Sequence, residues 1–228
     1  AAQASNFTVH SPSASCYEAS REMPEHTSFL SYLIAMFPAL GENMHNFGEL
    51  FANILRARRQ SFIVQNKWNL PESLGMEYDQ YDTPASRWLA VHEGGQVYGG
   101  VRLTPTTARC GVYSYMIRDA QKGLLDTIPS NLLDHEAPID PQVWEVTRGF
   151  VLHSVPADIR RRVHMRMVLE MSRVAREMGI TTMLALLPTN WTRWAARCNL
   201  DMKPAGRVMN MDGIDYQAVS LKFASNLH

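Results

Sequence analysis

The run of residues 78–82 carries two acidic side chains, Asp79 and Asp82, three positions apart. On a loop ahead of a strand, both carboxylates can point into one cleft, and paired carboxylates suit the binding of an ammonium or sulfonium cation. The alternative is a solvated loop in which the aspartates cap a turn, since aspartate is a common turn residue. Taken alone, the motif is more typical of such a turn.

A further acidic residue, Glu145, lies in a segment rich in β-branched and aromatic residues. In a strand, Glu145 and Thr147 share one face, while Val146 and Arg148 share the other. A charge inside an otherwise apolar strand is costly unless it is paired. Glu145 is therefore a candidate general base or amine anchor. Arg148 would pair with it only through a bulge or a strand end, or else would pair with another carboxylate. The alternative is an ordinary ion pair at a sheet edge.

Two other places hold arginines. Arg102 ends a predicted strand after Gly99 and Gly100, and consecutive glycines in a strand suggest a bulge or the close approach of another backbone or a ligand. A single strand arginine is usually structural. The run of three arginines at 160–162 opens a predicted helix, where free N–H groups attract a phosphate or an acidic carrier protein. A solvated cluster is the alternative. The chain shows no spacing typical of a metal site, a nucleophile elbow or a glycine-rich phosphate loop.

The elements that would position these residues follow from the apolar periodicity. Helices are predicted over 27–40, 44–66 (one or two in series), 158–178 and 191–198, with a possible short helix over 129–133. Strands are predicted over 88–92, 96–103, 113–117, 143–152, 180–187 and 216–223. The first two strands form a hairpin, and residues 68–83 form a loop. This order predicts an α/β (α+β) fold in which a mixed central sheet is flanked by helices.

Composition narrows the function classes. The 228 residues include 22 Lys plus Arg and 22 Asp plus Glu, so the zero net charge gives no general reason to bind nucleic acid or an anionic membrane. Three widely spaced cysteines favour a reducing, cytoplasmic setting. No apolar run approaches the ~20 residues that span a bilayer. Residues 1–25 lack a signal-peptide pattern and predict a flexible arm, followed by a single domain over 26–228.

The combined pattern is more specific than its parts. It consists of Arg58, Phe62 and Trp68, then Asp79-x-x-Asp82, then Arg102-Leu103-x-Pro105-Thr106-Thr107, then Glu145-x-x-Arg148. Over roughly residues 45–205 the chain resembles the acyl-homoserine lactone synthases of the autoinducer-synthase (LuxI-type) family. The resemblance implies a GNAT-like three-layer acyltransferase fold. It also implies that an acyl carrier protein or coenzyme A thioester acylates the amine of S-adenosylmethionine, which then lactonises and releases methylthioadenosine for quorum sensing. No metal or separate cofactor is implied.

The resemblance also implies roles for single residues. Glu145 would take the proton of the substrate amine, and Asp79 and Asp82 would hold the cationic part of S-adenosylmethionine. Arg102 and Arg148 would organise these carboxylates and the substrate carboxylate. The wall over the adenosyl site would consist of Arg58, Phe62 and Trp68, and the acyl chain would be lined by Met116, Val146, Phe150, Met183 and Leu187.

The chain departs from the family pattern after Thr107, where several residues are inserted, and it has a longer N-terminal arm. Leu187 stands where some members carry a threonine suited to 3-oxo chains, which favours an acyl group without that oxygen.

Two alternative functions remain open. One is a GNAT-like N-acyltransferase that acylates a free amino acid or amine without forming a lactone. The other is a non-catalytic GNAT-like binding module.

Overall fold

The computed structural model describes residues 33–38 and 49–223. The predicted arm over 1–25 lies outside the described residues, as do the flanks of the helix predicted over 27–40. The described part of that range is a strand, β1 (Leu33–Pro38), so the helix prediction is wrong there. Each residue of β1 finds an antiparallel partner on the neighbouring strand, and this pairing outweighs the local helical preference.

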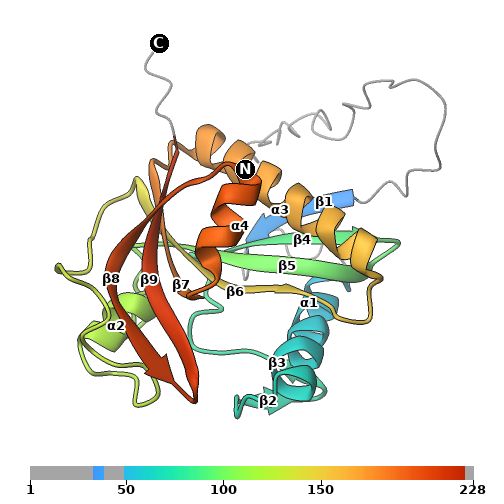
Figure 1. The fold of residues 1–228 in the computed structure, drawn as a ribbon. Helices are drawn as coiled ribbons and strands as arrows, with labels where there is room; N and C mark the ends of the chain where they lie inside the picture. The colour runs from blue at the N-terminus through green and yellow to red at the C-terminus, as the bar shows by residue number, and fades with distance from the viewer. Residues whose placement is uncertain (1–32, 39–48, 224–228) are drawn as a thin grey trace, which may run out of the picture. The chain divides into compact units, whose positions relative to one another are not determined.

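Seven strands form one mixed sheet in the order β1-β4-β5-β6-β7-β9-β8 (Figure 1). The remaining strands of this sheet are β4 (Arg87–Glu93), β5 (Gln96–Pro105), β6 (Val143–Val151), β7 (Thr182–Pro188), β8 (Asp201–Met211) and β9 (Ile214–Lys222). Only the β6–β7 pair is parallel, because a helix crosses over between them. The predicted mixed sheet is confirmed. The missed strand, β8, is an edge strand that contains Pro204, a residue that disguises strand character in a sequence.

Helix α1 (Leu50–Arg58) continues directly into the π-helical turns of η2 (Arg59–Gln65), as predicted for two helices in series. The other helices are α2 (Met116–Gln121), α3 (Ala157–Met178) and α4 (Trp191–Cys198). Two predictions are wrong: residues 113–117 are not a strand but lead into α2, and residues 129–133 are not helical. Helix α2 is too short to show a period, so its apolar residues imitate a strand.

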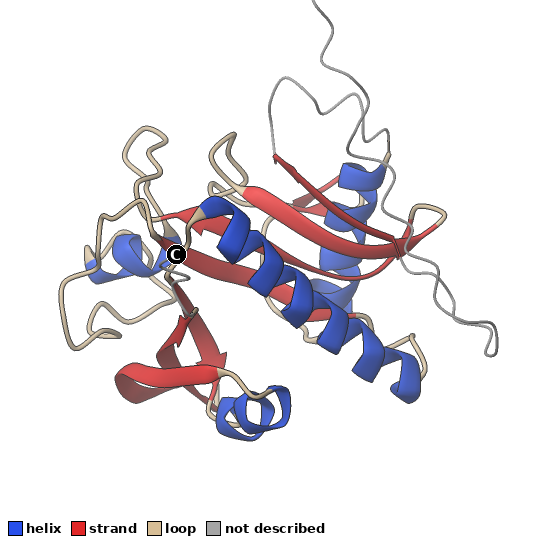
Figure 2. Ribbon diagram, turned by 90° about the horizontal axis from the view of Figure 1, so that it is seen from above, coloured by secondary structure: helices blue, strands red, loops and turns tan. Residues whose placement is uncertain are grey.

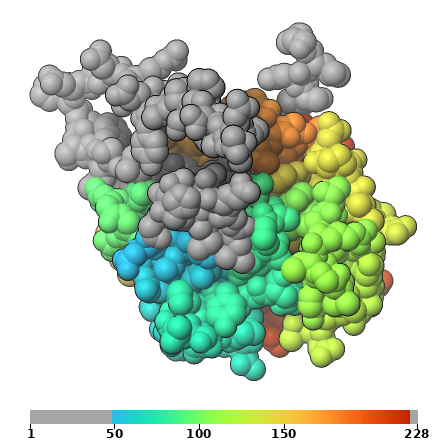
Figure 3. Space-filling model, turned by 180° about the vertical axis from the view of Figure 1, so that it is seen from behind, coloured from blue at the N-terminus to red at the C-terminus, as the bar shows by residue number. Residues whose placement is uncertain are grey.

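The helices lie on the two faces of the sheet. Helix α3 packs on β4 and β5 through residues such as Leu89 and Val101, while their neighbours Trp88 and Ala90 pack against α1. Figure 2 shows α3 lying across the sheet with α1 behind it. Seen from behind, α1 and the segment that carries α2 share one side of the molecule (Figure 3). Side-chain alternation along the strands therefore decides which helices each residue meets.

Two irregularities in the sheet concern the site. Between the pairs Gly100–Phe150 and Arg102–Thr147, one residue of β5 faces two residues of β6, which is a β-bulge. A Cβ atom on Gly99 would lie 2.8 Å from a main-chain oxygen of β6, so the predicted close approach of another backbone is confirmed. In addition, β6 pairs with β7 only over 143–146, although both strands continue beyond that point.

The predicted loop over 68–83 is mostly irregular but contains a small hairpin of β2 (Glu72–Ser73) and β3 (Met76–Glu77). Contacts tie β3 to α1 and to η2. This hairpin therefore fixes the start of the acidic run 77–82 against the helix that carries Arg58.

Candidate functional site

Six charged side chains from distant parts of the chain meet on the sheet face that α1 covers. We call them the ion network; it consists of Arg58 on α1, Glu77 on β3, Asp79 and Asp82 on the following turn, Arg102 on β5 and Arg148 on β6. All are at least nine-tenths buried except Arg148, whose side chain is 13% exposed. Three guanidinium groups balance three carboxylates, so the buried cluster is neutral. Burial of charge at this depth is tolerable only with such pairing.

Arg58 and Arg102, the two fully buried arginines, form hydrogen bonds with the acidic turn from opposite sides. Arg58 donates from Nη1 to both oxygens of Asp82, at 2.8 and 2.9 Å, and from Nε to Glu77. Arg102 donates from Nη2 to Asp79 at 3.1 Å and from Nη1 to both Asp79 and Asp82. Because each arginine bridges two carboxylates, the turn is fixed between α1 and β5.

The bulge in β6 explains where Arg148 points. Strict alternation would place Arg148 on the α3 face, away from the network. Arg148 instead adopts a positive φ of 52° and reaches Glu77 at 3.2 Å and Asp79 at 2.8 Å. The sequence left two arrangements open for Arg148: pairing with Glu145 through a bulge, or pairing with another carboxylate. The structure has the bulge, but Arg148 pairs with other carboxylates. Arg148 does not pair with Glu145.

The carboxylates of the network are already fully used as acceptors. Asp79 accepts from Arg102, from Arg148 and from the main-chain N–H of Tyr81, and Asp82 accepts from Arg58, Arg102 and the N–H of Asp79. Burial alone would raise the pKa of Asp79, but Arg102, Arg148 and Arg58 hold it far below its ordinary range. These aspartates therefore serve first to fix the arginines. Direct contact with a substrate cation remains a prediction.

Two of the three residues predicted to form a wall, Phe62 and Trp68, stack beside the network, whereas Arg58 belongs to the network itself. Phe62 and Trp68 stack with ring centroids 5.1 Å apart and planes 8° apart, and Phe62 meets Phe150 edge to face at 5.9 Å. The Arg148 guanidinium lies 5.7 Å from the Phe62 ring. Trp68 is 37% exposed, so part of its side chain remains accessible. A purine ring would add to such a stack.

Glu145 lies on the same sheet face as Arg102 but is bound differently. Its side chain is fully buried, and its two oxygens accept the main-chain N–H groups of Ile117 and Met116 at 2.7 and 3.0 Å. Burial raises the pKa of Glu145 to about 7, against the lowering effect of these two hydrogen bonds and of Arg102. A carboxyl group with a pKa near neutrality suits proton transfer.

The predicted acyl-binding residues do not form one cluster. Met116 packs in the core beside α2, and Phe150 packs beside α1, both on the face of the ion network. Val146, Met183 and Leu187 lie on the opposite face, among the residues that contact α3 and α4. Only the second group therefore shares one packed layer, under α3 and α4. The first group borders the ion network instead.

Sequence reasoning missed two polar residues of the site. Glu77 is fully buried and bridges Arg58 and Arg148. It was not predicted, because the acidic motif was taken to begin at Asp79. The alternation Glu77-x-Asp79 in the printed sequence was the available signal. Thr147 accepts from Arg102 Nε at 3.0 Å. Strand alternation placed Thr147 on the same face as Glu145, but its contact with Arg102 was not predicted.

The part of the chain that the structure describes shows neither a membrane-spanning helix nor a metal-binding group. None of its helices is both long and apolar enough to pass through a bilayer. Residues 33–38 and 49–223 contain no group of three or more His, Cys, Asp or Glu side chains arranged to hold a metal ion.

Comparison with known proteins points to one family. The family model described as autoinducer synthase matches residues 43–222. An acyl-homoserine-lactone synthase from Pseudomonas aeruginosa PAO1 is 24% identical over 189 residues, covering 81% of this chain and 86% of the relative. The isovaleryl-homoserine lactone synthase of Bradyrhizobium diazoefficiens is 26% identical over 65% of this chain and 62% of its own length. An acyl-homoserine-lactone synthase from Vibrio anguillarum is 31% identical, but the match spans only 45% of its length.

Solved structures agree at the level of the fold. The acyl-homoserine lactone synthase BjaI, solved with MTA, superposes with a TM-score of 0.68 at 22% identity, over 85% of this chain and 84% of BjaI. The synthase LasI superposes with a TM-score of 0.65 at 20% identity, over 84% of this chain and 89% of LasI. The predicted GNAT-like three-layer α/β fold is therefore confirmed.

Proposed function

Because the chain belongs to the autoinducer synthase family, we propose that it is an acyl-homoserine-lactone synthase. It transfers an acyl group from an acyl thioester to the amine of S-adenosylmethionine, closes the lactone and releases methylthioadenosine, which yields a quorum-sensing signal. One observation carries the assignment to this site: a carboxyl group with a pKa near 7, Glu145, shares a sheet face with a neutral ion network and a partly exposed aromatic stack, Phe62 and Trp68.

The chemistry divides between these groups. The substrate amine is an ammonium near neutral pH and must lose a proton before it attacks. Glu145 accepts that proton, directly or through a water molecule, the new N–C bond forms, and the C–S bond of the thioester breaks as the thiolate leaves. The substrate carboxylate then attacks its own γ-carbon and expels methylthioadenosine. Arg148, the most exposed arginine of the network, would hold that carboxylate before closure.

The adenosyl group would lie against the wall of Phe62 and Trp68, and the sulfonium would lie beside the acidic turn of Asp79 and Asp82. Because both aspartates are hydrogen-bonded to arginines, the sulfonium would experience the electrostatic field of the whole ion network rather than that of a single carboxylate. Because Arg58 and Arg102 fix this turn on both sides, the substrate meets a preorganised surface.

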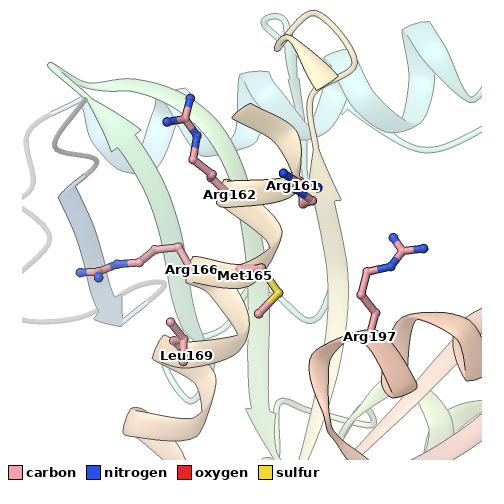
Figure 4. Close-up of a pocket in the computed structure, with 6 residues that line it drawn as sticks. All are labelled: Arg161, Arg162, Met165, Arg166, Leu169 and Arg197. Carbon is pink, nitrogen blue, oxygen red and sulfur yellow. The ribbon is translucent and has the colours of Figure 1, made fainter. Parts of the chain in front are cut away.

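Two features suit the thioester donor. Beyond Val146, β6 no longer pairs with β7, and the amides of a pantetheine arm would pair with β6 there. On the opposite helix layer, a groove of about 280 Å³ is lined by Arg161, Arg162, Met165, Arg166, Leu169 and Arg197 (Figure 4). Its four arginines, from α3 and α4, suit the phosphates of coenzyme A or the acidic surface of an acyl carrier protein.

The acyl chain would extend under α3 and α4, along Val146, Met183 and Leu187. Leu187 offers no hydrogen-bond donor, which favours an acyl group without a 3-oxo oxygen. Both cysteines of the described residues, the exposed Cys110 and the partly buried Cys198, are free thiols, which fits action in the reducing cytoplasm.

The test is direct. Purified protein is incubated with S-adenosylmethionine and a series of acyl carrier protein and coenzyme A thioesters, and the release of methylthioadenosine and the masses of the lactones are measured. The proposal requires both products in equal amounts. Acylation of a free amine without methylthioadenosine would favour the plain N-acyltransferase instead. The matched control is Glu145→Gln, which keeps the shape of the side chain and removes the base.

A further inference from the structure

A buried carboxylate outside the ion network, Asp119, has no role in the mechanism above. It lies in the first turn of α2 and is fully buried. A carboxylate is rarely buried this deeply unless its oxygens are paired, and its charge changes the pKa of titratable groups nearby. The contacts of Asp119 therefore show which part of the site it serves.

Two hydrogen bonds join Asp119 to the segment that leads into α2. Its Oδ2 accepts the main-chain N–H of Ser114 at 2.8 Å, and its Oδ1 accepts the Ser114 hydroxyl at 2.6 Å. Tyr115, at the N-cap of α2, forms no side-chain cap hydrogen bond. An acidic side chain that reaches back to the residues before a helix fixes the start of that helix, as in a capping box. Asp119 therefore determines where the first N–H groups of α2 lie.

These first N–H groups of α2 hold Glu145. Those of Ile117 and Met116 donate to its two oxygens at 2.7 and 3.0 Å. Burial raises the pKa of Glu145, and both hydrogen bonds lower it. Glu145 belongs to β6 and its donors belong to α2, so the placement of α2 on the sheet decides where the carboxylate is held. A displacement of about 1 Å at a catalytic group can lower a rate by about 10²-fold.

A third contact joins Asp119 to the acidic turn. Tyr81, which lies between Asp79 and Asp82 in the chain, donates a side-chain hydrogen bond to Asp119. Burial raises the pKa of Tyr81 far above its ordinary range, and the charge of Asp119 and this hydrogen bond raise it further, so the phenol keeps its proton. The Tyr81 ring lies 5.6 Å from the Arg102 guanidinium. Asp119 therefore links the start of α2 to the turn that the ion network fixes.

The charged and titratable groups around Glu145 come from the acidic turn, β5 and the start of α2. After burial and the two main-chain hydrogen bonds, Arg102 on β5 lowers the pKa of Glu145 and Asp119 on α2 raises it. Tyr81 and Tyr115 also lie close enough to interact with the charge of Glu145. Burial raises the pKa of both tyrosines far above their ordinary range, so they stay neutral near pH 7. Asp119 is thus a negative charge that opposes Arg102 at Glu145.

We propose that Asp119 is a positioning residue for proton transfer: through Ser114 it holds the start of α2 so that both N–H groups keep the Glu145 carboxylate in place. The inference rests on the proposed function. In that reaction the ammonium gives a proton to Glu145, the amine nitrogen bonds to the thioester carbonyl carbon, and the C–S bond breaks as the thiolate leaves. Asp119 forms and breaks no covalent bond in these steps. Its hydrogen bonds set the geometry of the base, and its charge favours the protonated form of Glu145.

The experiment compares the pH profile of kcat/KM in Asp119→Asn and Asp119→Ala. We define the midpoint as the pH at which kcat/KM reaches half of its high-pH plateau. Asparagine keeps the shape of the side chain and can still accept the Ser114 N–H, but it removes the charge. The pKa of Glu145 then falls, so the midpoint moves to lower pH and the plateau is unchanged.

Alanine removes both the charge and the anchor of α2. The two main-chain hydrogen bonds affect the pKa of Glu145 more than the charge of Asp119 does, so their loss moves the midpoint to higher pH. The plateau falls by about 10²-fold, because the base is no longer held in place. Should alanine at this position prevent folding, Ser114→Ala replaces it: it removes one anchoring hydrogen bond and keeps the charge, so its midpoint moves only to higher pH.

The matched control is Asp126→Asn, which removes the same charge from an exposed position after α2 and should leave the profile unchanged. Titration of the substrate amine is common to all variants and cancels in the comparison. An unmoved midpoint in Asp119→Asn would overturn the inference. So would a midpoint in the alanine variant that equals that of wild type or lies below it, because a merely structural residue lowers the rate without moving the profile upwards.

Failure of the proposed function is a separate result, because wild-type protein would then release no methylthioadenosine at any pH. Urea unfolding would still test the positioning role in that case. Glu145 makes stability depend on pH up to its folded pKa of about 7. The upper end of this pH window should lie lower in Asp119→Asn than in wild type, and an unchanged window would contradict the role assigned to Asp119.

Discussion

The contribution of Glu145 to the stability of the protein should fall as pH rises from about 4.5 to about 7. Its pKa is about 7 in the folded protein and has an ordinary value of 4.5. Between these values the folded state keeps a proton that the unfolded state releases, so the folded state binds more protons. The contribution of Glu145 to the free energy of unfolding therefore decreases with pH in this window and levels off above pH 7. The full effect of this shift is about 3 kcal/mol.

Glu145→Gln isolates this contribution. The glutamine oxygen still accepts one of the two α2 N–H groups, and the loss of the second acceptor costs about 1 kcal/mol, so the variant is the less stable protein at pH 5 and the more stable one at pH 8. The variant has no titrating group at this position, so its stability lacks the decline. Urea unfolding of both proteins at pH 5 and pH 8 measures the difference, and titrations common to the two cancel. Equal pH dependence in both proteins would refute the assigned environment of Glu145.

Two further predictions concern the frame of the site. Arg102→Ala leaves Asp79 and Asp82 buried without their shared partner, and urea unfolding should show a loss of about 3–5 kcal/mol; a loss below about 1 kcal/mol would mean that the network relaxes freely. Gly99→Ala places a Cβ atom 2.8 Å from a main-chain oxygen and should cost about 1–3 kcal/mol, whereas Gly149→Ala, whose nearest contact is 3.9 Å away, should change stability by less than about 0.5 kcal/mol. Equal losses in the two glycine variants would contradict the close approach of β5 and β6.

Much of the fold follows from local patterns in the sequence. Helix α3 shows apolar residues at helical spacing and ends at Gly179, which adopts the left-handed conformation that glycine favours. The hairpin of β4 and β5 follows from two strand patterns around Gly94 and Gly95. These elements were predictable because each carries its own signal over several residues.

The misplaced elements depend on partners far away in the chain. Strand β1 looks helical by itself and is a strand because β4 pairs with it. Helix α2 begins at Met116 because the Glu145 carboxylate accepts its first two N–H groups. A local pattern contains no information about a carboxylate almost thirty positions away, so both assignments required the tertiary structure.

The site shows the same division. Residue types and spacing identified both aspartates, Arg102, Glu145 and Arg148 as polar groups that a strand or loop would have to pair. They did not identify the pairs, because the bulge that turns Arg148 onto the network face depends on two strands in register. Glu77 was missed for a related reason: its importance comes from two arginines that only the fold brings to it.

Asp79 and Glu145 differ more clearly in their structural environments than in their sequence contexts. Both are buried carboxylates on one sheet face, but arginines surround Asp79 and lower its pKa, whereas burial dominates at Glu145 and raises its pKa to about 7. A carboxylate that never takes up a proton near neutral pH can fix charge and geometry but cannot act as a base. Glu145 can exchange a proton at that pH. Under the proposed function, the acidic turn would therefore fix the arginines that surround the substrate, and proton transfer would belong to Glu145.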